Sequence, residues 1–183
     1  MKNLTLLLAL TISAITNGQT VTTLSTDRFL KVNGTKFFPV GIYADGQGWP
    51  GAYSTYKYEL DIVQAAGFNT MVMDNTMLTN YDFNTFLDYS NSQGMKTMID
   101  FYDNIDANFI NTYKNKPSII GYTTDDAERF TIAQIQERQN TIMANDINHI
   151  HICDGSAGDL TNIPDAMHTM INITDGWGTQ WSL

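Results

Sequence analysis

The sequence predicts an α/β protein built on a parallel sheet. Six short apolar runs each end in an aspartate, and the stretches between the runs show helical periodicity. Such runs, separated by helical patterns, are typical of parallel strands joined by crossover helices. Because the carboxyl ends of all strands lie at one edge of such a sheet, the acids would line a single rim. They are Asp45, Asp74, Asp100, Asp125 with Asp126, Asp154 and Asp175.

An Asn-Gly pair predicts a β-hairpin ahead of the first parallel strand. Asn33 and Gly34 both tolerate positive φ, and the residues around them at 30–38 favour strands. The first parallel strand is expected at residues 38–44. A loop rich in glycine, tryptophan and proline follows at residues 46–54.

Four helices and five more strands follow at regular spacing. The helices are expected at residues 56–66, 81–93, 107–114 and 131–145. The strands are expected at residues 68–73, 96–99, 118–124, 147–153 and 169–174, with a short helical turn at 163–167. Gly67 and Gly94 are placed to end the first two helices. The helical side chains expected to face the core are Leu60, Ile62, Val63, Ala66, Phe83, Phe86, Leu87, Phe109, Ile110, Tyr113, Ile132, Ile135, Ile142 and Met143.

Residues 1–18 have the character of an export signal peptide. Lys2 supplies a positive start, and residues 4–15 form an apolar stretch too short to span a bilayer. Thr16 and Gly18 occupy suitable positions for cleavage before Gln19. We therefore expect one α/β domain at residues 19–183 of a secreted or periplasmic protein. The single cysteine, Cys153, allows no internal disulfide and is expected to be a small core residue.

The charge of the chain narrows the classes of partner. The formal net charge is −9, and removal of Lys2 with the signal peptide makes it −10. This argues against nucleic acid and against an anionic membrane as partners. An acidic surface with many aromatic residues suits a neutral ligand such as a carbohydrate. The sequence carries no phosphate-binding or dinucleotide-binding fingerprint, and we expect no cofactor.

Two architectures fit six βα units. A doubly wound parallel sheet with helices on both faces suits this chain length. A (β/α)8 barrel needs eight units and typically about 250 residues. Spacing alone therefore favours the doubly wound sheet.

Four segments in order nevertheless resemble the retaining glycoside hydrolases of the large (β/α)8-barrel clan, such as the cellulase-like and β-galactosidase-like families. Residues 29–43 resemble the hairpin and first barrel strand, and residues 59–72 resemble the first helix and second strand. Residues 92–99 resemble the approach to strand three. Lys116-Pro-Ser-Ile-Ile-Gly-Tyr-Thr-Thr-Asp-Asp126 resembles strand four and the acidic segment after it. The likeness extends to about Glu128 and favours an incomplete (β/α)8 barrel with an N-terminal β-hairpin.

The resemblance implies hydrolysis of O-glycosyl bonds by two carboxyl groups about 5–5.5 Å apart. One acid, after strand four, would protonate the leaving oxygen, and a carboxylate after strand seven would attack the anomeric carbon. The chain departs from this pattern twice. Ala127 stands where the family has its acid glutamate, and no seventh strand supplies the nucleophile. Asp126 or Glu128, with Asp125 beside them, would then be the catalytic acid, and whether the chain is an enzyme stays open.

Six barrel units also leave the first and last strands unpaired with each other. Three remedies are open. The chain would be a truncated relative of a longer enzyme, two copies would associate through the open sheet edges, or residues 20–32 would cover one edge.

Rim residues of two kinds are candidates for carbohydrate binding. Aromatic rings stack on the apolar faces of sugars, while polar neighbours bind the hydroxyls. For Tyr122, packing between helix and sheet is the competing expectation. The substrate-binding candidates are Tyr43, Trp49, Asp74, Asn75, Asp100, Tyr102, Tyr122, Asp154 and Trp177.

The histidines do not indicate a metal site. His149 and His151 would share one face of strand five, but they precede its carboxyl end, as His168 precedes strand six. Catalytic metals in such folds lie at the opposite end of the strands. We expect structural histidines and no metal, although the rim acids alone would suit Ca²⁺. Two functions remain open, a glycoside hydrolase-like enzyme acting on poly- or oligosaccharide and a catalytically inactive carbohydrate-binding or structural remnant of one.

Overall fold

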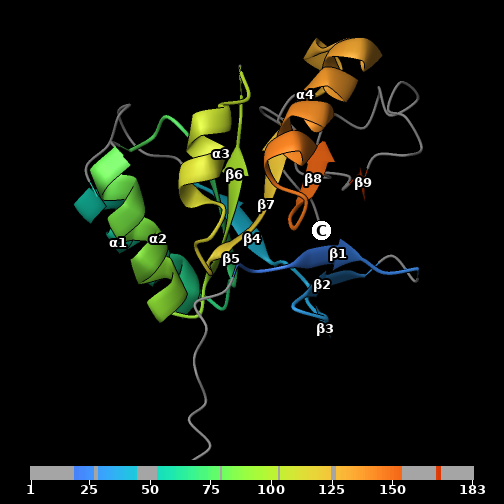
Figure 1. Ribbon diagram of the computed structural model, residues 1–183. Helices are drawn as coiled ribbons and strands as arrows, with labels where there is room; N and C mark the ends of the chain where they lie inside the picture. The colour runs from blue at the N-terminus through green and yellow to red at the C-terminus, as the bar shows by residue number, and fades with distance from the viewer. Residues whose placement is uncertain are drawn as a thin grey trace, which may run out of the picture.

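The main sheet contains six parallel strands that follow one another in chain order (Figure 1). The computed structural model describes residues 19–26, 29–44, 53–78, 80–102, 104–124, 127–153 and 168–169. Sequential strand order excludes the doubly wound arrangements and confirms the incomplete (β/α)8 barrel. In the described ranges, the first and last strands do not pair with each other. The strands are β4 (Gly41–Tyr43), β5 (Thr70–Asp74), β6 (Lys96–Asp100), β7 (Ile119–Thr124), β8 (Ile150–Cys153) and β9 (His168–Thr169).

Four helices connect these strands, and they are α1 (Tyr53–Ala65), α2 (Asn80–Ser92), α3 (Ala107–Tyr113) and α4 (Ile132–Asn145). Gly67, at φ 91°, follows α1 in a left-handed conformation that glycine adopts without strain. Thr131 begins α4 with a capping box, in which its hydroxyl accepts from the Gln134 backbone N–H and the Gln134 side chain accepts from the Thr131 backbone N–H. None of the helices in the described ranges has both the length and the apolar character needed to cross a membrane.

The larger core lies between the helices and the outer face of the sheet. Met71, Met73 and Ile99 come from the strands, and Phe86 and Leu87 come from α2. Figure 1 shows α1 and α2 side by side to the left of the sheet. The core residues expected from α2 and α3 are confirmed.

Several helical residues expected in the core face the solvent instead. Ile62 is 49% exposed, and Ala66, Ile132 and Met143 are also exposed. In α1 the buried stripe is formed by Tyr56, Leu60 and Val63, which recur at helical spacing and leave Ile62 outside. Ile132 is the first residue of α4, and Met143 lies near its end, beside the buried Ile142.

The predicted hairpin forms part of a small antiparallel sheet, which contains β1 (Thr22–Leu24), β2 (Leu30–Val32) and β3 (Thr35–Lys36). The turn has Asn33 at φ 50° and Gly34 at φ 80°, as the Asn-Gly pair predicts. Leu30 packs in a second cluster with Met98, Ile120 and Ile150 of the parallel strands. We call the sheet face that carries this cluster the inner face.

The N-terminal segment lies against the amino ends of the central strands. The Thr22 backbone N–H donates to the carbonyl of Asn148, which precedes β8, and the Thr20 hydroxyl donates to the carbonyl of Pro117, which precedes β7. The described part of this segment therefore packs across the amino ends of β7 and β8. The printed contacts of this segment lie at β7 and β8 rather than at β4.

A register shift in β7 changes which residues face inwards. The shift occurs where β6 and β7 pair, between Thr97 and Met98. Beyond it, a Cβ added at Gly121 would lie 3.1 Å from Ile150 Cγ1, so Gly121 faces the inner cluster. Tyr122 therefore faces the helices, where its ring stacks on Phe101 at 5.8 Å.

Candidate functional site

Asp74 and Asp100 lie side by side at the carboxyl ends of β5 and β6, where they are register partners. Residues two positions apart in a strand point to the same face. Asp74 therefore shares a face with Val72, and Asp100 shares a face with Met98, both of which lie in the inner cluster. Both carboxylates therefore belong to the inner face, at the strand ends where the sequence predicts a rim of acids. We call the residues Tyr43, Asp74, Asp100 and Thr123 the inner rim.

Asp100 is the centre of the inner rim. Its Oδ2 accepts a hydrogen bond of 2.9 Å from the Tyr43 hydroxyl, and its Oδ1 accepts one of 2.9 Å from the Thr123 hydroxyl. An ionised carboxylate accepts through both oxygens, so this geometry suits the anion. Asp100 is fully buried. It therefore holds Tyr43 and Thr123 in place, and it presents no exposed surface of its own to a ligand.

Asp74 organises the turn that follows β5. Its Oδ1 accepts from the backbone N–H of Thr76 at 2.7 Å and from the Thr76 hydroxyl at 2.8 Å. The backbone N–H of Asn75 donates to the carbonyl of Asp100. Aspartate side chains commonly stabilise turns in this way. Asn75 is half-buried, which leaves its side chain closer to the solvent than that of the buried Asp74.

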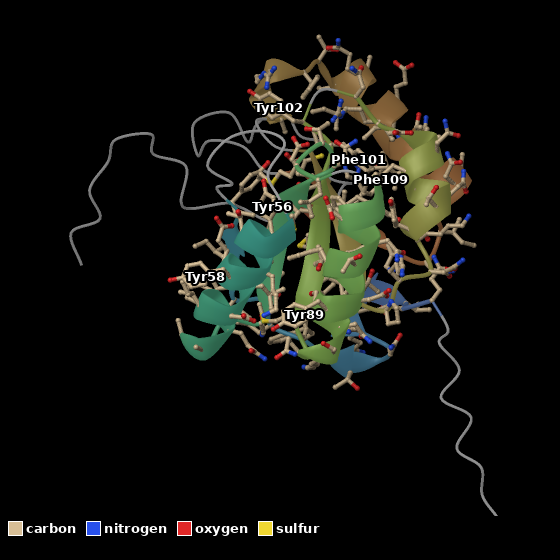
Figure 2. The ribbon with its side chains drawn as sticks, turned by 90° about the vertical axis from the view of Figure 1, so that its left-hand side faces the viewer. Tyr56, Tyr58, Tyr89, Phe101, Tyr102 and Phe109 are labelled. Atoms are coloured by element: carbon tan, nitrogen blue, oxygen red, sulfur yellow. The ribbon has the colours of Figure 1, made fainter. Side chains whose placement is uncertain are left out.

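Two aromatic rings reach the surface at this end of the strands. Tyr43 is 39% exposed and Tyr102 is 37% exposed. The Arg129 guanidinium lies over the Tyr102 ring at 4.2 Å, which is a cation–π contact. Figure 2 shows Tyr102 near the top of the molecule, while Phe101 and Phe109 lie together below it. Tyr43 and Tyr102 are thus aromatic residues exposed at the rim, and Arg129 covers one face of the Tyr102 ring.

Arg138, a residue that the sequence pattern did not single out, connects the carboxyl ends of β6 and β7 on the outer face. The buried side chain donates from Nε to the Thr124 hydroxyl at 3.1 Å and from Nη2 to the carbonyl of Phe101. The Thr124 hydroxyl also lies 2.9 Å from His151 Nε2. The available signal was the spacing of Arg138 between Ile135 and Ile142, the buried residues of α4.

The segment after β7 departs from the resemblance. Ala127, which stands where the family has its acid, begins the short 3₁₀ helix η1 (Ala127–Arg129). It is 1% exposed and packs with Ile135 of α4 and Cys153 of β8. That cluster lies on the helical side of the sheet. The side chain at position 127 therefore does not join the inner rim.

The remaining candidates are in three situations. Five of them lie outside the described residues, namely Asp125, Asp126, Trp49, Asp154 and Trp177. Glu128 belongs to η1, but its side chain lies outside the described part. Tyr122 is not a rim residue, because the β7 register shift turns it toward the helices, where it is fully buried.

Tyr122 joins a buried polar network near the amino ends of the strands. Its hydroxyl donates to Asp146 Oδ2 at 2.7 Å, and His149 Nδ1 lies 2.6 Å from the same oxygen. Burial alone would raise the pKa of Asp146, but the hydrogen bonds from His149, Tyr122 and the Asn148 backbone lower this pKa below its usual value. Burial, followed by the hydrogen bond to Asp146, raises the pKa of Tyr122 above its usual range. Tyr122 is thus a structural residue.

Among the residues whose side chains the structure describes, His149, His151 and the acids do not assemble a metal centre. No group of three or more His, Cys, Asp or Glu side chains there has a geometry that could hold an ion. His149 pairs with Asp146, and His151 pairs with Thr124. Both histidines therefore have hydrogen-bond partners inside the protein, which is consistent with structural roles.

The fold is that of glycoside hydrolase barrels. The chain is similar to the β-glucuronidase of Parabacteroides merdae, with a TM-score of 0.57 and 13% identity over 75% of this chain and 21% of that one. It is also similar to the β-D-glucuronidase of Dictyoglomus thermophilum, with a TM-score of 0.55 and 11% identity over 75% and 29% of the two chains. For Thermotoga maritima Cel5A the TM-score is 0.51, with 12% identity over 72% and 58%. No family model matches the sequence, and no curated protein matches it either.

These similarities define the class of fold. The chain forms an incomplete (β/α)8 barrel of the kind found in glycoside hydrolases. It spans between 21% and 58% of the length of these three structures. The resemblance drawn from the sequence is confirmed at the level of the fold.

Proposed function

We propose that this protein binds oligo- or polysaccharide at the inner rim and acts on O-glycosyl bonds in the manner of a glycoside hydrolase. The observation that carries the proposal is the fixed position of Tyr43. Its ring is partly exposed at the carboxyl end of β4, and its hydroxyl is held by the buried Asp100. A ligand would meet an aromatic surface whose orientation is set before binding.

The chemistry of the rim suits a neutral sugar. Aromatic rings such as those of Tyr43 and Tyr102 contact the apolar C–H faces of a sugar ring. Amide and hydroxyl groups nearby, such as the side chain of Asn75, bind its hydroxyl groups. Trp49, Asp154 and Trp177 would extend this surface. Asp100 and Asp74 act indirectly, because they position the residues and the turn that contact the ligand.

Hydrolysis requires a carboxylic acid near the leaving oxygen. We assign this role to the acidic segment that follows Thr124, which contains Asp125, Asp126 and Glu128. Like charges held close together raise the pKa of one member, as a general acid requires. The carboxylate that would attack the anomeric carbon is not assigned to a residue of this chain.

Aryl-glycoside hydrolysis and oligosaccharide binding test the proposal together. We expect Asp126→Asn or Glu128→Gln to lower turnover by about 10²-fold or more, because a general acid contributes that much. Tyr43→Ala should weaken binding measured by calorimetry. Glu137→Gln, an exposed change on α4, is the control and should alter neither quantity. Failure to bind any of a panel of oligosaccharides would disprove the proposal.

One observation favours a second function, that of a carbohydrate-binding protein without catalysis. Position 127 carries alanine and is packed behind the sheet, so the family's acid has no counterpart at that position. Under this alternative, the protein binds oligosaccharide through Tyr43 and Tyr102 but gives no turnover above buffer. Binding without turnover would therefore select the second function over the first.

A further inference from the structure

The side-chain amide of Gln19 is held at both of its polar atoms by residues distant in the chain. Nε2 donates to Asp146 Oδ1 at 2.8 Å, and Oε1 accepts from Asn148 Nδ2 at 2.6 Å. A carboxamide supplies the donor and the acceptor that this arrangement needs. We call Asp146 and Asn148 the Gln19 seat.

Asp146, one half of the Gln19 seat, is held by contacts that do not involve Gln19. Asp146 is buried, and its two oxygens also accept from the Tyr122 hydroxyl, from His149 Nδ1 and from the backbone N–H of Asn148. A preorganised site loses little entropy when its ligand docks. The hydrogen bonds to Gln19 are therefore favourable additions to a network that already exists.

The residues after Gln19 are docked in the same region. The Thr20 hydroxyl donates to the carbonyl of Pro117 at 2.9 Å. The Thr22 backbone N–H donates to the carbonyl of Asn148, and the Thr22 hydroxyl accepts from the Ile150 backbone N–H. Both threonines are buried. Residues 19–22 are thus hydrogen-bonded to the body of the protein, beginning with Gln19.

Gln19 is also the residue that would become the amino terminus if the signal peptide is cleaved where the sequence predicts. A free amino-terminal glutamine undergoes an internal reaction in which its α-amine attacks its own Cδ. A new N–Cδ bond forms, the Cδ–Nε2 bond breaks, and ammonia leaves with a proton from the amine. The product is the lactam pyroglutamate, and the reaction needs no oxidant or reductant. The lactam has lost the NH₂ group that donates to Asp146.

We propose that the Gln19 seat is the docking site for the processed amino terminus and that it protects Gln19 from cyclising to pyroglutamate. Ring closure turns Cδ toward the α-amine of the same residue, which requires the amide to leave Asp146 and Asn148. One of the two hydrogen bonds is made to a carboxylate and is the stronger kind. Because both hydrogen bonds must break before ring closure, they should slow cyclisation by roughly tenfold or more relative to an undocked terminus.

The test exports the full chain from a bacterial host and measures the intact mass of the recovered protein. The proposal expects a chain that begins at Gln19 and retains its amide. During incubation, loss of one ammonia should be roughly tenfold slower or more in the folded protein than in urea. A chain that begins elsewhere, or equal rates in the folded and unfolded protein, would overturn the proposal.

Single substitutions test whether the Gln19 seat is what protects Gln19 from cyclisation. Asn148→Ala removes the donor to Oε1 and should speed cyclisation in the folded protein, with folding verified by circular dichroism. Asp146→Asn should do the same, but it alters a buried network, so Asn148→Ala is the primary variant. Gln136→Ala breaks an exposed hydrogen bond to Asn140 on α4 and is the matched control. An Asn148→Ala protein that cyclises at the wild-type rate would contradict the assignment of the seat.

Discussion

The Tyr43 hydroxyl donates to Asp100 Oδ2 at 2.9 Å, although these residues belong to strands that do not pair with each other. Tyr43 is in β4 and Asp100 is in β6, with β5 between them. The hydrogen bond therefore crosses over one strand on the inner face. Side chains from alternate strands meet in this way inside (β/α)8 barrels. The contact forms because the sheet curves enough to bring β4 and β6 together above β5, and it fixes the position of the exposed Tyr43 ring.

We expect Tyr43→Phe to lower both stability and carbohydrate affinity while keeping the ring. The buried Asp100 would lose a hydroxyl donor, which costs about 1–3 kcal/mol of unfolding free energy. The ring would also lose its fixed orientation, so affinity should fall in calorimetry. Tyr58→Phe, on the exposed side of α1, is the control. Unchanged stability and affinity in Tyr43→Phe would show that the hydroxyl of Tyr43 does not position the ring.

The second prediction concerns the acid sensitivity of the buried Asp146 network. The pKa of Asp146 is lowered in the folded protein, so its contribution to stability is present above the unfolded value of about 4 and is lost as pH falls through the folded pKa. Asp146→Asn should remove this dependence and cost about 1–3 kcal/mol at neutral pH.

Urea unfolding across pH measures the effect. The difference in unfolding free energy between wild type and Asp146→Asn should narrow as pH falls below about 4. Asp88→Asn, which affects a more exposed pair with Lys116, is the matched control. A difference that stays constant between neutral and acidic pH would contradict the role of the ionised carboxylate.

The order of the elements could be predicted because their local signals agree with one another. Asn33 and Gly34 form the predicted turn, and all four helices lie close to their expected positions. The incomplete barrel required the family resemblance, because spacing alone favoured a doubly wound sheet. Strand order depends on contacts between distant residues, which periodicity does not report.

The orientation of single rim residues could be predicted only in part. The position of Asp74 and Asp100 at the rim could be predicted because each ends its strand, whereas only the structure decides between the two expectations for Tyr122, since the register shift in β7 turns it toward the helices. A bulge of this kind adds one residue and turns the following side chains to the other face. The role of Arg138 could not be read from the helical pattern, because the pattern of apolar residues in α4 does not show that a charged side chain will fill a buried position between Ile135 and Ile142.

The third prediction is that Arg138→Lys destabilises the strand ends. Lysine lacks the planar fork that reaches both the Thr124 hydroxyl and the carbonyl of Phe101. It also stacks less well on Phe130, whose ring lies 4.5 Å from the Arg138 guanidinium. We expect a loss of about 1–3 kcal/mol in urea unfolding. A variant as stable as wild type would show that these contacts contribute little.

The fourth prediction concerns self-association through the open edge at β4. Phe38 is 74% exposed, and Ile42 and Tyr43 are also exposed. An exposed edge strand with apolar side chains favours pairing with another copy, and a lysine there opposes it. We expect Ile42→Lys to shift the protein toward monomer in light scattering coupled to gel filtration. Ile62→Lys, at a similarly exposed position on α1, should leave the mass unchanged. A wild-type protein that stays monomeric at high concentration would refute this prediction.

The fifth prediction is that Ala127→Glu destabilises the protein and does not restore an active site. The resemblance aligns position 127 with the family's acid, but the structure encloses Ala127 between Ile135 and Cys153. A glutamate there would place a carboxyl group in an apolar cluster with no room for it, at a cost of roughly 3 kcal/mol or more. Ala133→Glu, at an exposed position of α4, adds the same group and should change stability by less than about 0.5 kcal/mol. Urea unfolding of both variants, together with aryl-glycoside turnover, makes the comparison. A stable Ala127→Glu protein with increased turnover would mean that position 127 faces the inner rim after all, and that the acid was lost from a site otherwise able to use it.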